Sequence, residues 1–279
     1  MPPASPTAHV LPRFADPFAM AHKGDPLLAM IGLVMALMMI PTVAALLLDG
    51  RTLGGVNVWV KPLKFEASLA VHLITVALAL TLLPEAERGS GLVKVLVAAI
   101  VAVSLFEIAY IAMQAARGQG SHYNTASAFT RLMFAAMGIG AMVLVAATAA
   151  IGLIVLRHAS LAEPLTLAVG LGLALGGLLG GVTGLQLGGN GSYLVGTPVP
   201  GADTLPIVGW SRTAGDLRVA HFIGLHLMQA LPLLAIIARV ALPASAQVPV
   251  VIAGAALGVA ATFAALAQAR AGLPLWPLG

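Results

Sequence analysis

The sequence contains no cysteine among its 279 residues. This absence excludes disulfide bonds, thiolate zinc sites, iron–sulfur clusters and cysteine nucleophiles, and it leaves the redox compartment open. Charged residues are scarce as well, at 9% of the chain, whereas 59% of the residues are hydrophobic. Because soluble domains contain roughly 25% charged residues, this composition excludes a soluble globular protein.

Concentrated positive charge is also missing. The formal net charge is +4, but the basic residues are scattered singly among apolar runs. A nucleic-acid-binding protein gathers its basic residues into a patch or stripe that follows the phosphates. We therefore expect no nucleic-acid partner, and we expect the lipid bilayer as the main environment, in a bacterial inner membrane.

Long apolar runs dominate the rest of the chain. A helix needs about 20 apolar residues to cross a bilayer, and lipid leaves only helices or closed barrels as spanning structures. The runs are continuous rather than alternating, so the sequence predicts an all-α bundle of about seven transmembrane helices. The seven expected spans are 27–48, 62–84, 92–114, 127–156, 161–187, 216–242 and 247–271.

The remaining segments are short. Residues 1–26 form a polar, proline-rich leader without the apolar core of a secretory signal peptide, and residues 272–279 form a C-terminal tail. Pro232 lies inside the sixth span and should kink it, because proline removes the hydrogen bond to the carbonyl of Met228. The connection 188–215 is long for a compact bundle, which is typical of a functional loop or lid.

The fifth span is rich in glycine, with Gly176 and Gly180 near its centre. Small residues at such spacing let neighbouring helices, or a flat cofactor, approach the backbone closely. We expect close helix packing here.

The two membrane faces carry similar numbers of basic residues. We call the face of the N-terminus side A and the opposite face side B. Positive charge gathers on the cytoplasmic side of membrane proteins, but here it scarcely separates the two faces. The expected orientation has the N-terminus inside.

Ionisable residues within the spans gather toward side B. At 1.5 Å per residue, Glu66 and His221 lie about 7 Å below that face, Glu107 about 10 Å, and His72 and His226 about 15 Å. Charged or titratable residues inside a membrane are expensive and mark functional sites by default. The expected site lies between the second, third and sixth spans under the 188–215 loop, and its other polar members are Ser68, Gln114, Arg131, Gln229 and, in a connecting loop, His122.

Two cofactors suit this set of side chains. Haem b is held by two histidines from different helices, with an arginine available for a propionate. Such a site predicts a redox role in electron transfer. Its candidate residues are His72, His122, His221, His226, Arg218 and Arg212.

Zinc is the second cofactor. A catalytic zinc ion is held by three protein ligands and keeps an open position for water. The candidate ligands are His72, Glu107 and His226. This reading predicts a metal-dependent hydrolase that acts on a lipid. A small-solute or proton-coupled transporter built from the same acids and histidines is a further alternative, and a lipid or quinone-like molecule is a candidate partner.

Two segments carry a resemblance. Trp59-Val-Lys-Pro-Leu-Lys-Phe65 and Gly215-Asp-Leu-Arg-Val-Ala-His-Phe-Ile-Gly-Leu-His226 resemble an uncharacterised family of bacterial polytopic membrane proteins. More weakly, Leu217-Arg218-x-x-His221-x-x-Gly224 is similar to a helix of membrane b-type cytochromes, a resemblance that implies a haem ligand at His221. Ser68-x-x-x-His72 resembles the second helix of the alkaline ceramidases, which are seven-helix zinc hydrolases.

Overall fold

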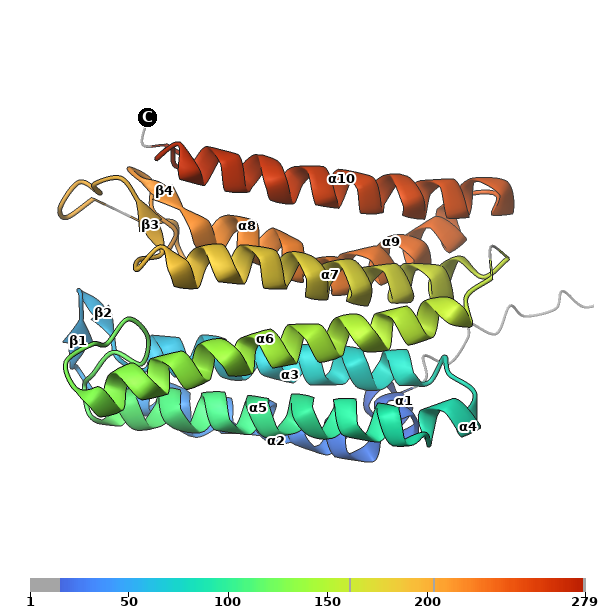
Figure 1. The fold of residues 1–279 in the computed structure, drawn as a ribbon, viewed down its shortest axis with the longest axis horizontal. Helices are drawn as coiled ribbons and strands as arrows, with labels where there is room; N and C mark the ends of the chain where they lie inside the picture. The colour runs from blue at the N-terminus through green and yellow to red at the C-terminus, as the bar shows by residue number, and fades with distance from the viewer. Residues whose placement is uncertain (1–15, 161, 203, 278–279) are drawn as a thin grey trace, which may run out of the picture.

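The protein is an elongated bundle of helices that lie roughly parallel to one another (Figure 1). The computed structural model describes residues 16–160, 162–202 and 204–277. Six helices are long and apolar enough to cross a membrane, and a bent pair provides a seventh span. The expected all-α membrane bundle is confirmed. The spans are α2 (Pro26–Leu48), α3 (Val60–Leu80), α5 (Gly91–Ala116), α6 (Ala128–Arg157), α7 (Pro164–Gly189), the pair α8 (Leu217–Leu225) and α9 (Leu227–Ala241), and α10 (Ala244–Arg270).

Short elements cap both ends of the bundle. Side A carries α1 (Pro17–Gly24) and α4 (Glu85–Arg88), whereas side B carries two small antiparallel hairpins (Figure 1). One hairpin pairs β1 (Thr52–Leu53) with β2 (Val56–Asn57), and the other pairs β3 (Leu194–Val195) with β4 (Gly215–Asp216). The second hairpin joins the two ends of the expected 188–215 loop.

The leader expected at residues 1–26 is partly structured. Asp16 caps α1 by accepting a hydrogen bond from the amide of Phe18 at 2.9 Å. Ala21 is fully buried, and Gly24 lies so close to the carbonyl of Ala77 on α3 that a side chain would not fit. Residues 17–24 therefore belong to the bundle, and residues 1–15 lie outside the described part of the chain.

The bundle consists of two halves that meet along α6 and α7. In Figure 1, α2, α3, α5 and α6 lie on one side of this seam, and α7, α8, α9 and α10 lie on the other. Glycines make α7 narrow on two faces: Gly177 meets α6 at Ala149, whereas Gly176 meets the carbonyl of Leu225. The close helix packing expected from the glycines is present.

The sixth span breaks at an unexpected residue. The axes of α8 and α9 differ by 47°, and the break lies at His226 rather than at Pro232. The backbone amide of His226 donates to the carbonyl of Phe222 at 3.0 Å, and its Nδ1 lies 2.8 Å from the same oxygen. A side chain that enters the backbone ladder is a recognised cause of kinks.

The topology gives a direct expectation for accessibility. Tags inserted at Glu87, Arg157 and Arg239 should all report side A, whereas tags at Gly118 and Gly201 should report side B. Labelling with a membrane-impermeant reagent in sealed vesicles measures this. Opposite locations for Gly118 and Gly201 would contradict the seven-span arrangement, because both positions lie on the end that carries the hairpins.

Candidate functional site

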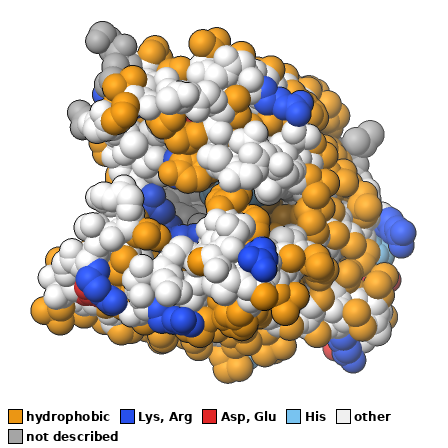
Figure 2. Space-filling view, turned by 60° about the vertical axis from the view of Figure 1, so that its left-hand side comes forward, with side chains coloured by type: hydrophobic (Ala, Val, Ile, Leu, Met, Phe, Trp, Pro, Cys, Tyr) orange, Lys and Arg blue, Asp and Glu red, His pale blue; other side chains and the backbone are white. Residues whose placement is uncertain are grey.

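The bundle is hollowed at its side-B end (Figure 2), and we call the space between α3 and α8 there the groove. Both helices start at side B (Figure 1). On α3, Lys64, Ser68 and Val71 form one stripe at helical spacing, and all three are exposed. On α8, the facing stripe contains Arg218 and Phe222, and Phe222 is 42% exposed. These exposed side chains form the facing walls of the groove.

Hydrogen bonds define both ends of this groove. Deep in the membrane, Nε2 of Gln229 on α9 donates to Oγ1 of Thr75 on α3 at 3.1 Å. At side B, Nζ of Lys64 donates to the carbonyl of Val208 at 3.1 Å, and a guanidinium nitrogen of Arg218 donates to the adjacent carbonyl of Gly209 at 2.7 Å. The 208–209 segment therefore bridges two cations, one from each half. Figure 2 shows this end hollowed, with lysine and arginine side chains inside the hollow.

His72 and His226 lie at the same depth on opposite walls. His72 is three residues before Thr75, and His226 is three residues before Gln229. Both histidines therefore lie about 4.5 Å closer to side B than the Thr75–Gln229 hydrogen bond. Nε2 of His72 lies 3.2 Å from Oγ1 of Thr148 on α6. The Thr148 hydroxyl donates to the carbonyl of Leu144, so it accepts the proton of His72. Nδ1 of His72 is then left with a lone pair.

His221 lies about one and a half turns closer to side B than His226 and is held in the same way. Its Nδ1 is 3.0 Å from Oγ1 of Thr183 on α7, and this hydroxyl donates to the carbonyl of Leu179. The imidazole packs against Gly184, where an added Cβ would lie 3.4 Å from the ring. Both deep histidines are thus oriented through one nitrogen by a threonine on the neighbouring helix.

Aromatic side chains line the α8 wall. The ring of Phe222 stacks on His226 with centroids 3.9 Å apart, and Trp210 meets Phe222 edge-on at 5.4 Å. The guanidinium of Arg218 lies 4.0 Å from the ring centre of Tyr193. The mouth of the groove therefore carries Lys64 and the Arg218–Asp216 ion pair, and the groove is aromatic further in.

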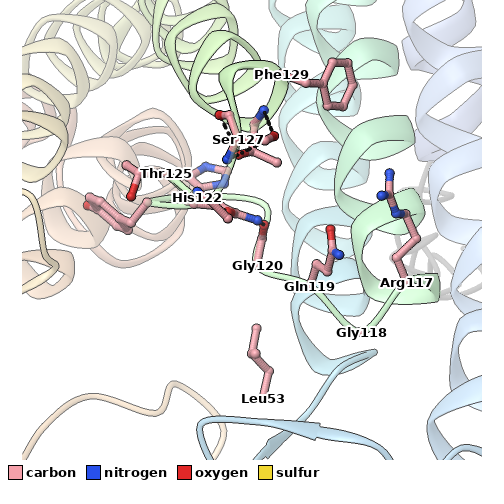
Figure 3. Close-up of a pocket in the computed structure, with 13 residues that line it drawn as sticks. Leu53, Arg117, Gly118, Gln119, Gly120, His122, Thr125, Ser127 and Phe129 are labelled. Carbon is pink, nitrogen blue, oxygen red and sulfur yellow. Dashed lines mark hydrogen bonds between the residues drawn. The ribbon is translucent and has the colours of Figure 1, made fainter.

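His122 lines a pocket of about 730 Å³ that opens at side B (Figure 3). Nζ of Lys61 lies 2.9 Å from Nδ1 of His122. Burial lowers the pKa of His122 to about 3, and the positive charge of Lys61 adds to this effect. His122 is therefore neutral near pH 7, and its Nδ1 accepts a hydrogen bond from the Lys61 ammonium.

The buried acids lie inside the α2–α3–α5–α6 half rather than in the groove. Glu66 is 2% exposed and accepts a hydrogen bond from Oγ1 of Thr42 on α2 at 2.7 Å. Glu107 is 5% exposed and lies against Gly140 on α6. The single polar layer expected from the sequence is thus divided: His72 and His226 flank the groove, whereas the acids and Gln114 lie in the interior of one half.

The three expected zinc ligands have separate partners. Within the described residues, no group of three or more histidine, aspartate or glutamate side chains is placed to hold a metal ion. His72 is bonded to α6, His226 to its own helix, and Glu107 lies within electrostatic range of Lys61.

Two arginine candidates point elsewhere. Arg131 is exposed and donates to the carbonyl of Thr125 at 3.1 Å. Arg212 donates to the carbonyl of Pro277 at 3.3 Å and so holds the C-terminal tail. Among the arginine candidates, only Arg218 reaches the mouth of the groove.

Lys61, Lys64 and Phe222 have roles that the sequence pattern did not assign. The two lysines read as cations that extend to the lipid headgroups, and Phe222 reads as an ordinary apolar residue. The sequence signal for these roles was the helical spacing. Phe222 lies four residues before His226, and Lys61 and Lys64 lie three residues apart, so each pair shares one face of its helix.

Comparisons with protein-family models, with curated proteins and with solved structures gave no match.

Proposed function

We propose that this chain is a bacterial inner-membrane protein that binds haem b in the α3–α8 groove and has a role in electron transfer. The observation that carries the proposal is the level placement of His72 and His226 on opposite walls. A bis-histidine haem needs one imidazole on each face of a flat ring. A groove between two helices provides this arrangement without a third ligand.

The mouth of the groove supports the same ligand. Haem b carries two propionates, and Lys64 and Arg218 lie at side B on either side of the 208–209 segment. Cationic donors pair strongly with carboxylates. Histidines that ligate a metal usually donate their second nitrogen to a fixed acceptor, as His72 and His226 do here.

An absorption spectrum tests the proposal. The purified protein should show a Soret band, and His72→Ala and His226→Ala should each abolish it. His158→Ala is the matched control, because His158 is exposed at the side-A end of α6 and should leave the band unchanged. A colourless protein that also fails to bind added haemin would overturn the proposal.

An iron-free amphiphile with an acidic head group is the second candidate. It is favoured by the aromatic wall of Trp210 and Phe222 beside the Arg218 cation, which suits a lipid or a quinone-like molecule as well as a porphyrin. Mass spectrometry of the colourless protein would then detect a bound lipid or quinone, and Arg218→Gln should reduce its occupancy.

A further inference from the structure

A line of unpartnered polar atoms runs through the α2–α3–α5–α6 half. The atoms are Oε1 of Gln114, the hydroxyl of Tyr110 and Oε1 of Glu107, and none of them has a hydrogen-bond partner among the described residues. All three residues are at most 5% exposed. Glu107, Tyr110 and Gln114 are spaced i, i+3 and i+7 along one face of α5, so together they cover about 10 Å of depth.

Such atoms need water in a membrane interior. A buried polar group without a hydrogen bond costs several kcal/mol in an apolar medium, roughly 2–7 kcal/mol by transfer scales. Buried waters typically satisfy such groups with about three hydrogen bonds each. Three such groups in one line along a helix indicate a continuous site for water rather than isolated defects.

The outer end of this line reaches the side-B pocket. Nε2 of Gln114 donates to the carbonyl of Gly120 at 3.1 Å, and Gly120 lines the pocket with His122 (Figure 3). Lys61 lies between the side-B pocket and Glu107, because its ammonium contacts His122 and is within electrostatic range of Glu107.

The inner end is closed. One turn beyond Glu107, Ser104 is fully buried and uses its hydroxyl to donate to the carbonyl of Ile100 at 2.8 Å. Ile100 and Val97 then belong to the main apolar core, which fills the side-A half. Polar atoms without partners therefore occur on the side-B part of this face and stop at Glu107.

We propose that a column of water runs along this face of α5 from the side-B pocket to Glu107, and that it lets this carboxyl group exchange protons with side B alone. The proton moves between the Glu107 carboxyl and water, so no other reactant is needed. The titratable groups around this path are Lys61 on α3, Tyr110 on α5, and His122 and Arg117 at the side-B pocket, and Gly140 forms the α6 wall. The proposal is independent of the haem site.

The cysteine-free sequence makes accessibility measurable without background. A small, charged, membrane-impermeant thiol reagent reacts with thiolate, which forms where water is present. Gln114→Cys and Tyr110→Cys should react from side B of oriented proteoliposomes. Ile111→Cys is the matched control, because Ile111 is adjacent to Tyr110, equally buried and in the same apolar cluster, but its side chain leaves the helix about 100° away from the line of unpartnered atoms. We expect it to react at least about tenfold more slowly.

Two outcomes would overturn the proposal. One is a rate for Tyr110→Cys as slow as that of Ile111→Cys, and the other is labelling from side A. Infrared spectroscopy of the native chain provides a second test that needs no cysteine variant to fold. A carboxyl C=O band that is missing in Glu107→Gln should follow the pH of side B and ignore the pH of side A. A band that follows side A, or neither side, contradicts the water column.

Discussion

Replacing Gly177 by alanine should strongly destabilise the protein, because the new methyl group would meet the α6 backbone. An added Cβ would lie 2.8 Å from both the amide nitrogen and the Cβ of Ala149, and it would also crowd the carbonyl of Val145. Real Cβ atoms do not approach backbone this closely, so α6 and α7 would have to separate. Overpacking of a dense core typically lowers the free energy of unfolding by about 1–3 kcal/mol. Because the backbone of α6 cannot move aside easily, we expect a loss near the upper end of this range for Gly177→Ala.

Thermal unfolding in a mild detergent measures this effect. Gly138→Ala on α6 is the matched control, because nothing lies within 4 Å of a Cβ at that position. The control should not destabilise the protein, and it should raise the free energy of unfolding by up to about 1 kcal/mol, because alanine has a higher helix propensity than glycine. Equal stability of the two variants would show that the seam between the halves is looser than described.

Asp216→Ala should produce the second large effect. Asp216 is 1% exposed and accepts hydrogen bonds from the amide and the guanidinium of Arg218, and from the amide of Ser211. Its removal would leave Arg218 without its carboxylate and the start of α8 without a cap. Loss of one partner of a buried ion pair costs about 3–5 kcal/mol, and the 32% exposure of Arg218 favours the lower end.

The chain contains its own control for this variant. Asp49 accepts the same three bonds from Arg51, again two residues later, but this pair is exposed at side B. The guanidinium of Arg51 holds the pKa of Asp49 well below its usual range. Exposed pairs contribute little to stability, so Asp49→Ala, which also removes a hydrogen bond from the indole of Trp59, should lower the thermal midpoint much less than Asp216→Ala. Similar losses for both variants would show that burial does not distinguish them.

Hydrophobic runs predicted the spans well because a bilayer allows few alternatives. The expected 92–114 and 127–156 correspond to α5 and α6 within two residues at each end. The glycines of the fifth span also indicated close packing, since only a very small residue permits the contacts seen at Gly177. These features depend on local composition, which is visible in the sequence.

Side-chain direction was not visible in the same way. Depth alone grouped Glu107 with His72, but depth does not say which face of a helix meets which neighbour. Glu107 turns toward α6 inside one half, whereas His226 turns back onto its own backbone at Phe222. The break at His226 was missed for the same reason, because a histidine that bonds to the carbonyl four residues earlier leaves no pattern in composition.

The exposed apolar lining of the groove has a consequence for how the protein must be handled. Val71 is 51% exposed and Phe222 is 42% exposed at depths within the hydrocarbon layer. The proposed ligand would therefore enter sideways from the bilayer, and its occupancy would depend on its mole fraction in lipid rather than on its aqueous concentration. Detergent dilutes that reservoir. Extraction into lipid nanodiscs should retain a ligand that repeated washing in micelles removes.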